Sequence, residues 1–180
     1  MGCNLRKPGR AVKRAAVLII LLGTVCACSM PARQENISTE QFQAIETFNA
    51  TVAANVYGGF DEGSVRRPYP LRGADFERAL VDSLQASRLF DDVVSSSEEA
   101  DINLNVGLMQ LIQPTWSGSI SLESTWTFYD RAGTEISRKK IKSVMRSSFN
   151  YKKQVTERVA TDTILQGLQW LQKELQEIPN

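Results

Sequence analysis

The stretch SISLESTWTFYDRAG, from Ser119 to Gly133, decides the fold because it joins a strict alternation to a turn. One set of alternate positions is mainly apolar and the other is polar. The first set consists of Ile120, Leu122, Ser124, Trp126 and Phe128. A period of two residues is typical of a strand with one buried face. The segment DRAG then predicts a hairpin turn with Gly133 at a positive φ, so an antiparallel strand should follow directly.

That following strand is predicted over 134–149, TEISRKKIKSVMRSSF. Its apolar positions are Ile136, Ile141, Val144 and Met145. Because the parity shifts between Ile136 and Ile141, a second bulge or a twisted edge is expected here.

Three more strands are predicted before the hairpin. The segment DINLNVGLMQLIQ (101–113) alternates up to Leu108 and then changes parity, which predicts a bulge near Gly107–Met109. An earlier strand in ETFNATVAANVYGGF (46–60) should stop at the two glycines, and DDVVSS (91–96) should form a short strand.

Two amphipathic helices complete the pattern. The segment ADFERALVDSLQASRLF (74–90) places Phe76, Leu80 and Leu84 on one stripe, and a longer helix is predicted over 152–178. Gly167 lies inside the second helix, where glycine costs about 1 kcal/mol relative to alanine, so close packing is expected there. The order β-α-β-β-β-β-α predicts an α+β two-layer sandwich, with two helices on one face of a mainly antiparallel sheet of 4–5 strands.

The N-terminal segment predicts export. AAVLIILLGTVCACSM (Ala15–Met30) contains an apolar run of 11 residues, or 14 if it is extended to Cys28. A membrane-spanning helix needs about 20 apolar residues, so this run has the length of a signal-peptide core. Five cations and no acid precede it: Arg6, Lys7, Arg10, Lys13 and Arg14.

The segment VCAC (Val25–Cys28) resembles the lipobox of bacterial lipoproteins. Cys26, at position −2 from the expected cleavage site, departs from the family pattern. The resemblance implies cleavage between Ala27 and Cys28, diacylglycerol on the Cys28 thiol and acylation of the new N-terminus. Ser29 points by the same resemblance to the outer membrane. A plain secretory signal with an incidental cysteine is the alternative. Residues 1–27 are thus a predicted signal peptide, 28–41 a flexible tether and 42–180 a single periplasmic domain.

Composition argues against several classes of function. Five of the 21 cations and none of the 20 acids lie in residues 1–27, so the mature chain keeps 16 cations against 20 acids and a net charge of −4. An acidic chain without a basic tail is a poor nucleic-acid binder. The sequence has no histidine, and its single mature cysteine is the expected lipid-bearing residue. The usual general base and nucleophile pairs are therefore missing, and we expect no enzyme activity, metal or cofactor.

Four features of the sequence are candidate sites. The basic run RKKIK supplies Arg138, Lys139, Lys140 and Lys142. It is either a solvated edge strand or a patch for an anionic partner. Trp116, in the turn PTWSGS, either packs or anchors an interface.

Ser137 and Lys140 have the S-x-x-K spacing of penicillin-binding enzymes, but in a strand they should point to opposite faces. The acidic groups at 91–92 and 98–101 lack the spacing of a calcium loop.

Two stretches resemble a set of uncharacterised bacterial outer-membrane lipoproteins. They are VYGG (56–59) with DFERALVDSLQASRLF (75–90), and LIQP (111–114) with the hairpin and closing helix that follow. The element order is also distantly similar to auxiliary lipoproteins of envelope transport systems. The resemblance implies class and location, and it supplies no catalytic residues.

These observations favour a non-enzymatic lipoprotein that is held in the outer membrane by its acyl chains and faces the periplasm. Its expected role is that of an accessory or scaffold in an envelope assembly, with an envelope protein as partner. A lipid- or small-ligand-binding module, with an apolar pocket between helices and sheet, is the alternative. An enzyme built on Asp, Glu, Tyr or Lys alone ranks third.

Overall fold

The computed structural model of the chain describes residues 42–60, 69–148 and 151–177. The predicted signal peptide (1–27), Cys28 and the predicted tether over 28–41 lie outside the described residues. The described elements are β1 (Phe48–Tyr57), α2 (Gly73–Ser87), β2 (Phe90–Val94), β3 (Ile102–Ile112), β4 (Gly118–Asp130), β5 (Glu135–Ser147) and α3 (Lys152–Glu177). Their order is the predicted β-α-β-β-β-β-α, and the fold is α+β as expected.

The five strands form one sheet in the order β2-β1-β3-β4-β5. The three longest strands, β3, β4 and β5, are antiparallel neighbours, whereas β1 runs parallel to both β2 and β3. Parallel neighbours need a long crossover connection, and α2 provides it between β1 and β2. The sequence pattern predicted the antiparallel part, and the parallel pairing of β1 comes from this crossover.

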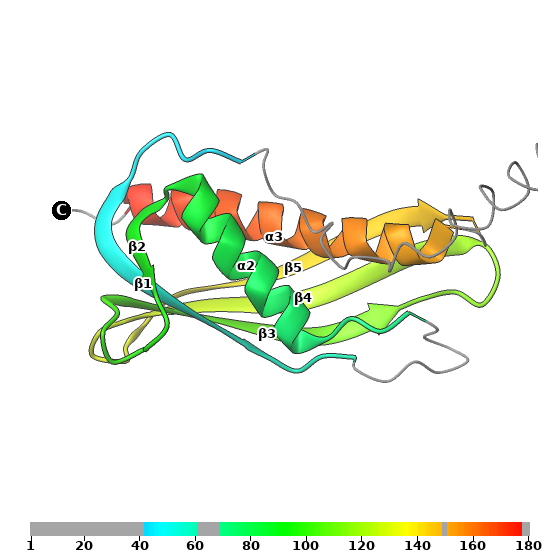
Figure 1. Cartoon of the computed structure of the whole chain (residues 1–180), viewed down its shortest axis with the longest axis horizontal. Helices are drawn as coiled ribbons and strands as arrows, with labels where there is room; N and C mark the ends of the chain where they lie inside the picture. The colour runs from blue at the N-terminus through cyan, green and yellow to red at the C-terminus, as the bar shows by residue number, and fades with distance from the viewer. Residues whose placement is uncertain (1–41, 61–68, 149–150, 178–180) are drawn as a thin grey trace, which may run out of the picture. The chain divides into compact units, whose positions relative to one another are not determined.

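Both helices cover the same face of the sheet, as predicted (Figure 1). α3 packs on β4 and β5, α2 packs on β1 and β2, and the two helices also contact each other. We call the covered face the inner face and the opposite one the outer face. Inner-face side chains such as Leu104, Trp126 and Phe128 are fully buried, and each large apolar side chain removed from water contributes about 1.5–3 kcal/mol. Neither helix in the described part of the chain is long and apolar enough to cross a membrane.

Both predicted irregularities in the sheet are present. The pairing of β3 with β4 shifts between Leu108 and Gln110, which leaves Met109 in a bulge. The pairing of β4 with β5 shifts where Phe128 faces Ser137 and Tyr129 faces Glu135, so Ile136 lies in a second bulge. Each bulge changes which face the following side chains occupy.

The structure corrects two predictions, the apolar positions of β5 and the end of α2. Ile136 and Val144 were expected among the apolar positions of their strand, but both are exposed. Val144 pairs with Ser121 on the outer face, whereas Ile141 pairs with Ser124 on the inner face. The helix predicted over 74–90 ends at Ser87, because Arg88 adopts the left-handed conformation with φ of 54°.

The inner face and α3 meet most closely at Trp126 and Gly167. Trp126 is fully buried, and its indole Nε1 donates a hydrogen bond to Ser124 Oγ at 2.9 Å. A Cβ atom at position 167 would overlap the six-membered part of the Trp126 ring. The glycine predicted to mark close packing therefore lies directly over the tryptophan.

This contact predicts the effect of Gly167→Ala. Alanine would gain about 1 kcal/mol in helix propensity, but overpacking typically costs about 1–3 kcal/mol, so we expect a net loss of stability. Urea denaturation of the variant, with Gln169→Ala on the exposed side of α3 as the matched control, measures it. A Gly167→Ala protein as stable as the control would contradict the packing described here.

Candidate functional site

The outer face of the sheet is exposed to solvent, and its end near the β3–β4 hairpin carries apolar side chains. Ile112, Ser121 and Val144 form one row across β3, β4 and β5. Ile112 and Val144 are exposed, and Met109 in the bulge beside this row is 63% exposed. Apolar groups gathered on one exposed sheet face are typical of an interaction surface.

The four cations of the predicted patch lie on β5, but they do not share one face. Trp126 faces Lys139 across the β4–β5 pairing, so Lys139 lies on the inner side, next to α3. Arg138, Lys140 and Lys142 alternate with it and lie on the outer side. The patch on the outer face therefore consists of these three residues, which we call the basic rim.

Two cations of the basic rim are already paired with acids. The Arg138 guanidinium lies 2.6 Å from Glu135 Oε2, and Lys142 Nζ lies 2.5 Å from Glu123 Oε1. The negative charge of Glu135 is the main cause that raises the pKa of Arg138 above its ordinary value. Both pairs are largely exposed, and exposed pairs contribute little to stability. Within the described chain Lys140 has no such pair, so it is the cation most available to a partner.

A depression of about 320 Å³ lies beside Lys140 on the outer face. Met109, Glu123, Thr125 and Lys142 also line it. Its size is at the lower end of the range for small-ligand sites. The expected apolar pocket was placed between the helices and the sheet, whereas this depression lies on the opposite face, over the bulge in β3.

Trp116 lies at the tip of the β3–β4 hairpin and is 75% exposed. The base of this hairpin is firmly held. Lys152, the first residue of α3, is buried, and its Nζ donates to the carbonyl oxygens of Pro114 and Thr115 at 2.5 Å each. These bonds limit the motion of the hairpin tip. Little chain entropy would therefore be lost if the Trp116 ring bound a partner.

Gln113 holds the same hairpin from its other side. Its Nε2 donates to the Tyr69 carbonyl at 2.7 Å and to Thr156 Oγ1 at 3.0 Å, while its Oε1 accepts from the Tyr69 amide at 3.2 Å. The Gln113 side chain thus bonds both the amide and the carbonyl of Tyr69, as the backbone of a neighbouring strand would. The structure leaves Trp116 exposed rather than packed, and its role as an interface anchor stays a prediction.

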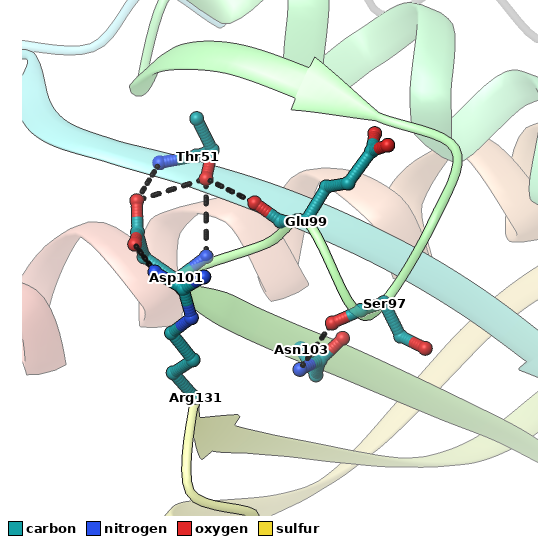
Figure 2. Close-up of polar contacts among 6 residues, drawn as sticks. All are labelled: Thr51, Ser97, Glu99, Asp101, Asn103 and Arg131. Atoms are coloured by element: carbon teal, nitrogen blue, oxygen red, sulfur yellow. Dashed lines mark hydrogen bonds and ion pairs between the residues drawn. The ribbon is translucent and has the colours of Figure 1, made fainter.

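The opposite end of the sheet is held by Asp101 and Thr51 (Figure 2). Asp101 Oδ2 accepts from the Thr51 amide at 3.0 Å and from Thr51 Oγ1 at 2.8 Å, and the Asp101 amide donates to Thr51 Oγ1 at 3.0 Å. The bond from the Thr51 amide is the main cause that lowers the pKa of Asp101, and Arg131, 3.9 Å away, lowers it further. This reciprocal contact fixes a bulge at the start of β1 against the start of β3.

Ser137 and Lys140 lie on opposite faces of β5, as the strand prediction required. The Ser137 hydroxyl is on the inner side and donates to Glu174 Oε2 of α3 at 2.7 Å. Lys140 belongs to the outer basic rim. In this arrangement the lysine cannot take the proton of the serine, so the pair lacks the geometry of a nucleophile and its base.

Several residues of the candidate site were not found from the sequence. The contacts of Asp101 with Thr51 and of Lys152 with the hairpin carbonyls join segments far apart in the sequence, so no local pattern pointed to either residue. In the described residues no three His, Cys, Asp or Glu side chains are placed to hold a metal ion. Cys28 and Ala27 lie outside the described residues, so lipid attachment and cleavage there stay predictions.

The sequence matches no protein-family model and no curated protein. Solved structures do share the fold. Protein XCC0632 from Xanthomonas campestris, of family DUF330, is 12% identical with a TM-score of 0.57, and the match covers 76% of this chain and 90% of that one. A protein named only as uncharacterized is 11% identical with a TM-score of 0.52, over 72% and 97% of the two chains.

The hypothetical protein CT253 from Chlamydia trachomatis is 12% identical with a TM-score of 0.51, and the match covers 69% of this chain and 96% of that chain. At such low identity these likenesses show the fold alone. Function must therefore be argued from the surfaces of this chain.

The Asp101 contact predicts how stability depends on pH. The folded pKa lies below the ordinary value of 3.8, so the stabilisation is complete above that value and is lost as the pH falls through the folded pKa. The Asp101→Asn variant should be less stable than the wild type at neutral pH, and the difference should shrink between about pH 5 and pH 2. Denaturant titrations across this range measure it. A difference that does not change with pH would contradict the assigned role of the carboxylate.

Proposed function

We propose that this protein is a lipid-anchored, non-enzymatic accessory component of a cell-envelope assembly, facing the periplasm from the outer membrane. The lipobox pattern at Val25–Cys28 and the short apolar run before it support the anchor. The anchor leaves the domain over 42–180 free to act in the periplasm at the end of its tether.

The observation that carries the accessory role is the exposed outer face. A two-layer domain buries one face of its sheet under its helices and presents the other. Here that face bears the exposed side chains of Met109, Ile112 and Val144 beside the basic rim. This combination of an apolar centre and a charged border is the usual anatomy of a protein interface.

The basic rim specifies the chemistry of the partner. Lys140 has no acidic neighbour within ion-pair distance in the described chain, and the pairs of Arg138 and Lys142 are exposed enough to exchange partners. A second copy of this chain would bring cations against cations if the two rims met. We therefore infer an envelope protein with an acidic surface as the partner, since opposite charges across an interface speed association and exclude wrong partners.

Trp116 contributes a second contact at the hairpin end of the same domain. Tryptophan is enriched among the residues that dominate binding energy, especially where the ring enters a desolvated pocket. The bonds that Lys152 and Gln113 make to the hairpin hold its base in place. We infer that Trp116 is the apolar anchor of the interface and that the basic rim orients it.

The anchor is tested by the Cys28→Ala variant. The wild-type protein should fractionate with membranes, and mass spectrometry should find an N-terminal Cys28 that carries acyl chains. The variant should lose the lipid mass and leave the membrane fraction, because three acyl chains supply its membrane affinity. A wild-type chain that begins at another residue, or carries no lipid, would refute the anchor.

The partner surface is tested by photo-cross-linking in intact cells from a cross-linker placed at Met109. We expect a product of defined mass that weakens severalfold with Lys140→Glu and persists with Lys139→Glu. The second variant makes the same change of charge on the same strand, but on the inner side of the sheet.

Equal cross-linking in the two variants would contradict the proposed acidic partner. Absence of any product from Met109, with the anchor intact, would contradict the proposed interface as a whole. Denaturation curves of both variants check that each one is folded.

A further inference from the structure

The outer face has a second hollow, at the end of the sheet away from the hairpin of Trp116. Its volume is about 390 Å³, and it is lined by Asn55, Ser97, Asn103, Asn105, Tyr129 and Gly133. We call it the asparagine hollow. None of these six residues carries a charge at neutral pH, in contrast to the basic rim on β5.

The strand register brings the three amides together. Asn55 of β1 pairs with Asn105 of β3, and Asn103 of β3 pairs with Tyr129 of β4. The alternating neighbours Leu104 and Val106 are buried on the inner face, so the asparagines point outward. Neighbouring strands lie about 4.8 Å apart, which places the amides at the spacing of groups on one small ligand.

The amide of Asn103 has an unsatisfied acceptor. Its Nδ2 donates to the Ser97 carbonyl at 3.3 Å (Figure 2), whereas its Oδ1 is buried and has no hydrogen-bond partner among the described residues. A buried acceptor without a donor is unfavourable. A rotation of the Asn103 side chain that lets a ligand hydroxyl donate to this oxygen would therefore stabilise the complex.

The borders of the hollow are fixed by the fold. Asp101, two residues before Asn103, is tied to Thr51 by four hydrogen bonds. In the β4–β5 turn the Asp130 carboxylate accepts from the Thr134 amide at 2.7 Å, and the Gly133 amide donates to the Asp130 carbonyl at 3.0 Å. The site is thus built on paired strands and a closed turn, which favours binding with little rearrangement of the backbone.

The lining selects among classes of ligand. Three amides offer donors and acceptors together, as vicinal hydroxyl groups do, and Tyr129 adds an aromatic ring. A charged ligand would find no opposite charge in the lining. An apolar ligand would bury the amides without partners, and an extended peptide pairs with a sheet edge rather than with a face.

We propose that the asparagine hollow binds a neutral oligosaccharide, whose hydroxyl groups pair with the amides of Asn55 and Asn105 and, after a rotation of the Asn103 side chain, with Asn103 Oδ1. This inference does not depend on the acyl anchor, and it uses none of the residues of the basic rim. Arg138 of the rim lies in the same row across the sheet as Asn55 and Asn105, so the rim borders the hollow.

Calorimetric titration of the purified full-length protein tests the proposal. The protein is kept in a detergent without a sugar headgroup, and the probes are the N-acetylglucosamine tetramer and maltotetraose. We expect saturable binding of at least one probe that does not depend on salt. Asn105→Ala should weaken it about tenfold, which corresponds to about 1.4 kcal/mol, and Asn103→Ala should weaken it similarly. Gln110→Ala removes an exposed amide of the same strand outside the hollow and should have no effect.

Three results would overturn the proposal. They are no binding of either probe at millimolar concentration, equal affinity of the Asn105→Ala and wild-type proteins, and binding that is lost with Lys140→Gln or with added salt. Because Asn103 also holds the loop that carries Ser97, the Asn105→Ala variant decides the result if Asn103→Ala unfolds. None of these measurements depends on Met109 cross-linking, so a failure here is distinct from a failure of the proposed function.

Discussion

The contact between Trp126 and Gly167 is the constraint on which the arrangement of the two layers depends. The indole fills the inner face of β4, and only a residue without a side chain lets α3 lie directly over it. With α3 seated there, β4 and β5 are covered from one side, and α2 covers β1 and β2 beside it. The helices thereby bury one face of the sheet and leave the other as the surface that this domain can offer.

That outer face is divided between two chemistries. Toward the hairpin of Trp116 it carries Met109, Ile112 and Val144 beside the basic rim, which suits an apolar protein surface with an acidic border. Toward the β4–β5 turn it carries the uncharged asparagine hollow. The cations of β5 also disfavour pairing of this edge strand with a second copy, so protection of the edge and selection of a partner are compatible roles of the same residues.

The features predicted from the sequence are those that depend on the two-residue alternation of side chains along a strand. Alternation in β4 placed Trp126 in the core, and parity changes located both bulges, because a strand has a period of two whatever lies beside it. The same rule separates Lys139 from Lys140, although the four cations were predicted as one patch. Contacts between segments far apart in sequence were not predictable: the Asp101–Thr51 bonds and the Asn55–Asn105 pairing need the register of β1 against β3. The buried Lys152 resembles any exposed lysine until the hairpin carbonyls are placed over it.

We propose that a partner in the envelope covers the outer face of the sheet. Oxidation footprinting at Met109 measures this directly, because exposed methionines form sulfoxides readily and covered ones do not. Intact cells and the purified protein are treated with the same dose of hydrogen peroxide, and Met145, which packs against the core, serves as the internal reference. The account predicts that Met109 is protected in cells and reactive after purification. Equal reactivity of Met109 in both samples would contradict it.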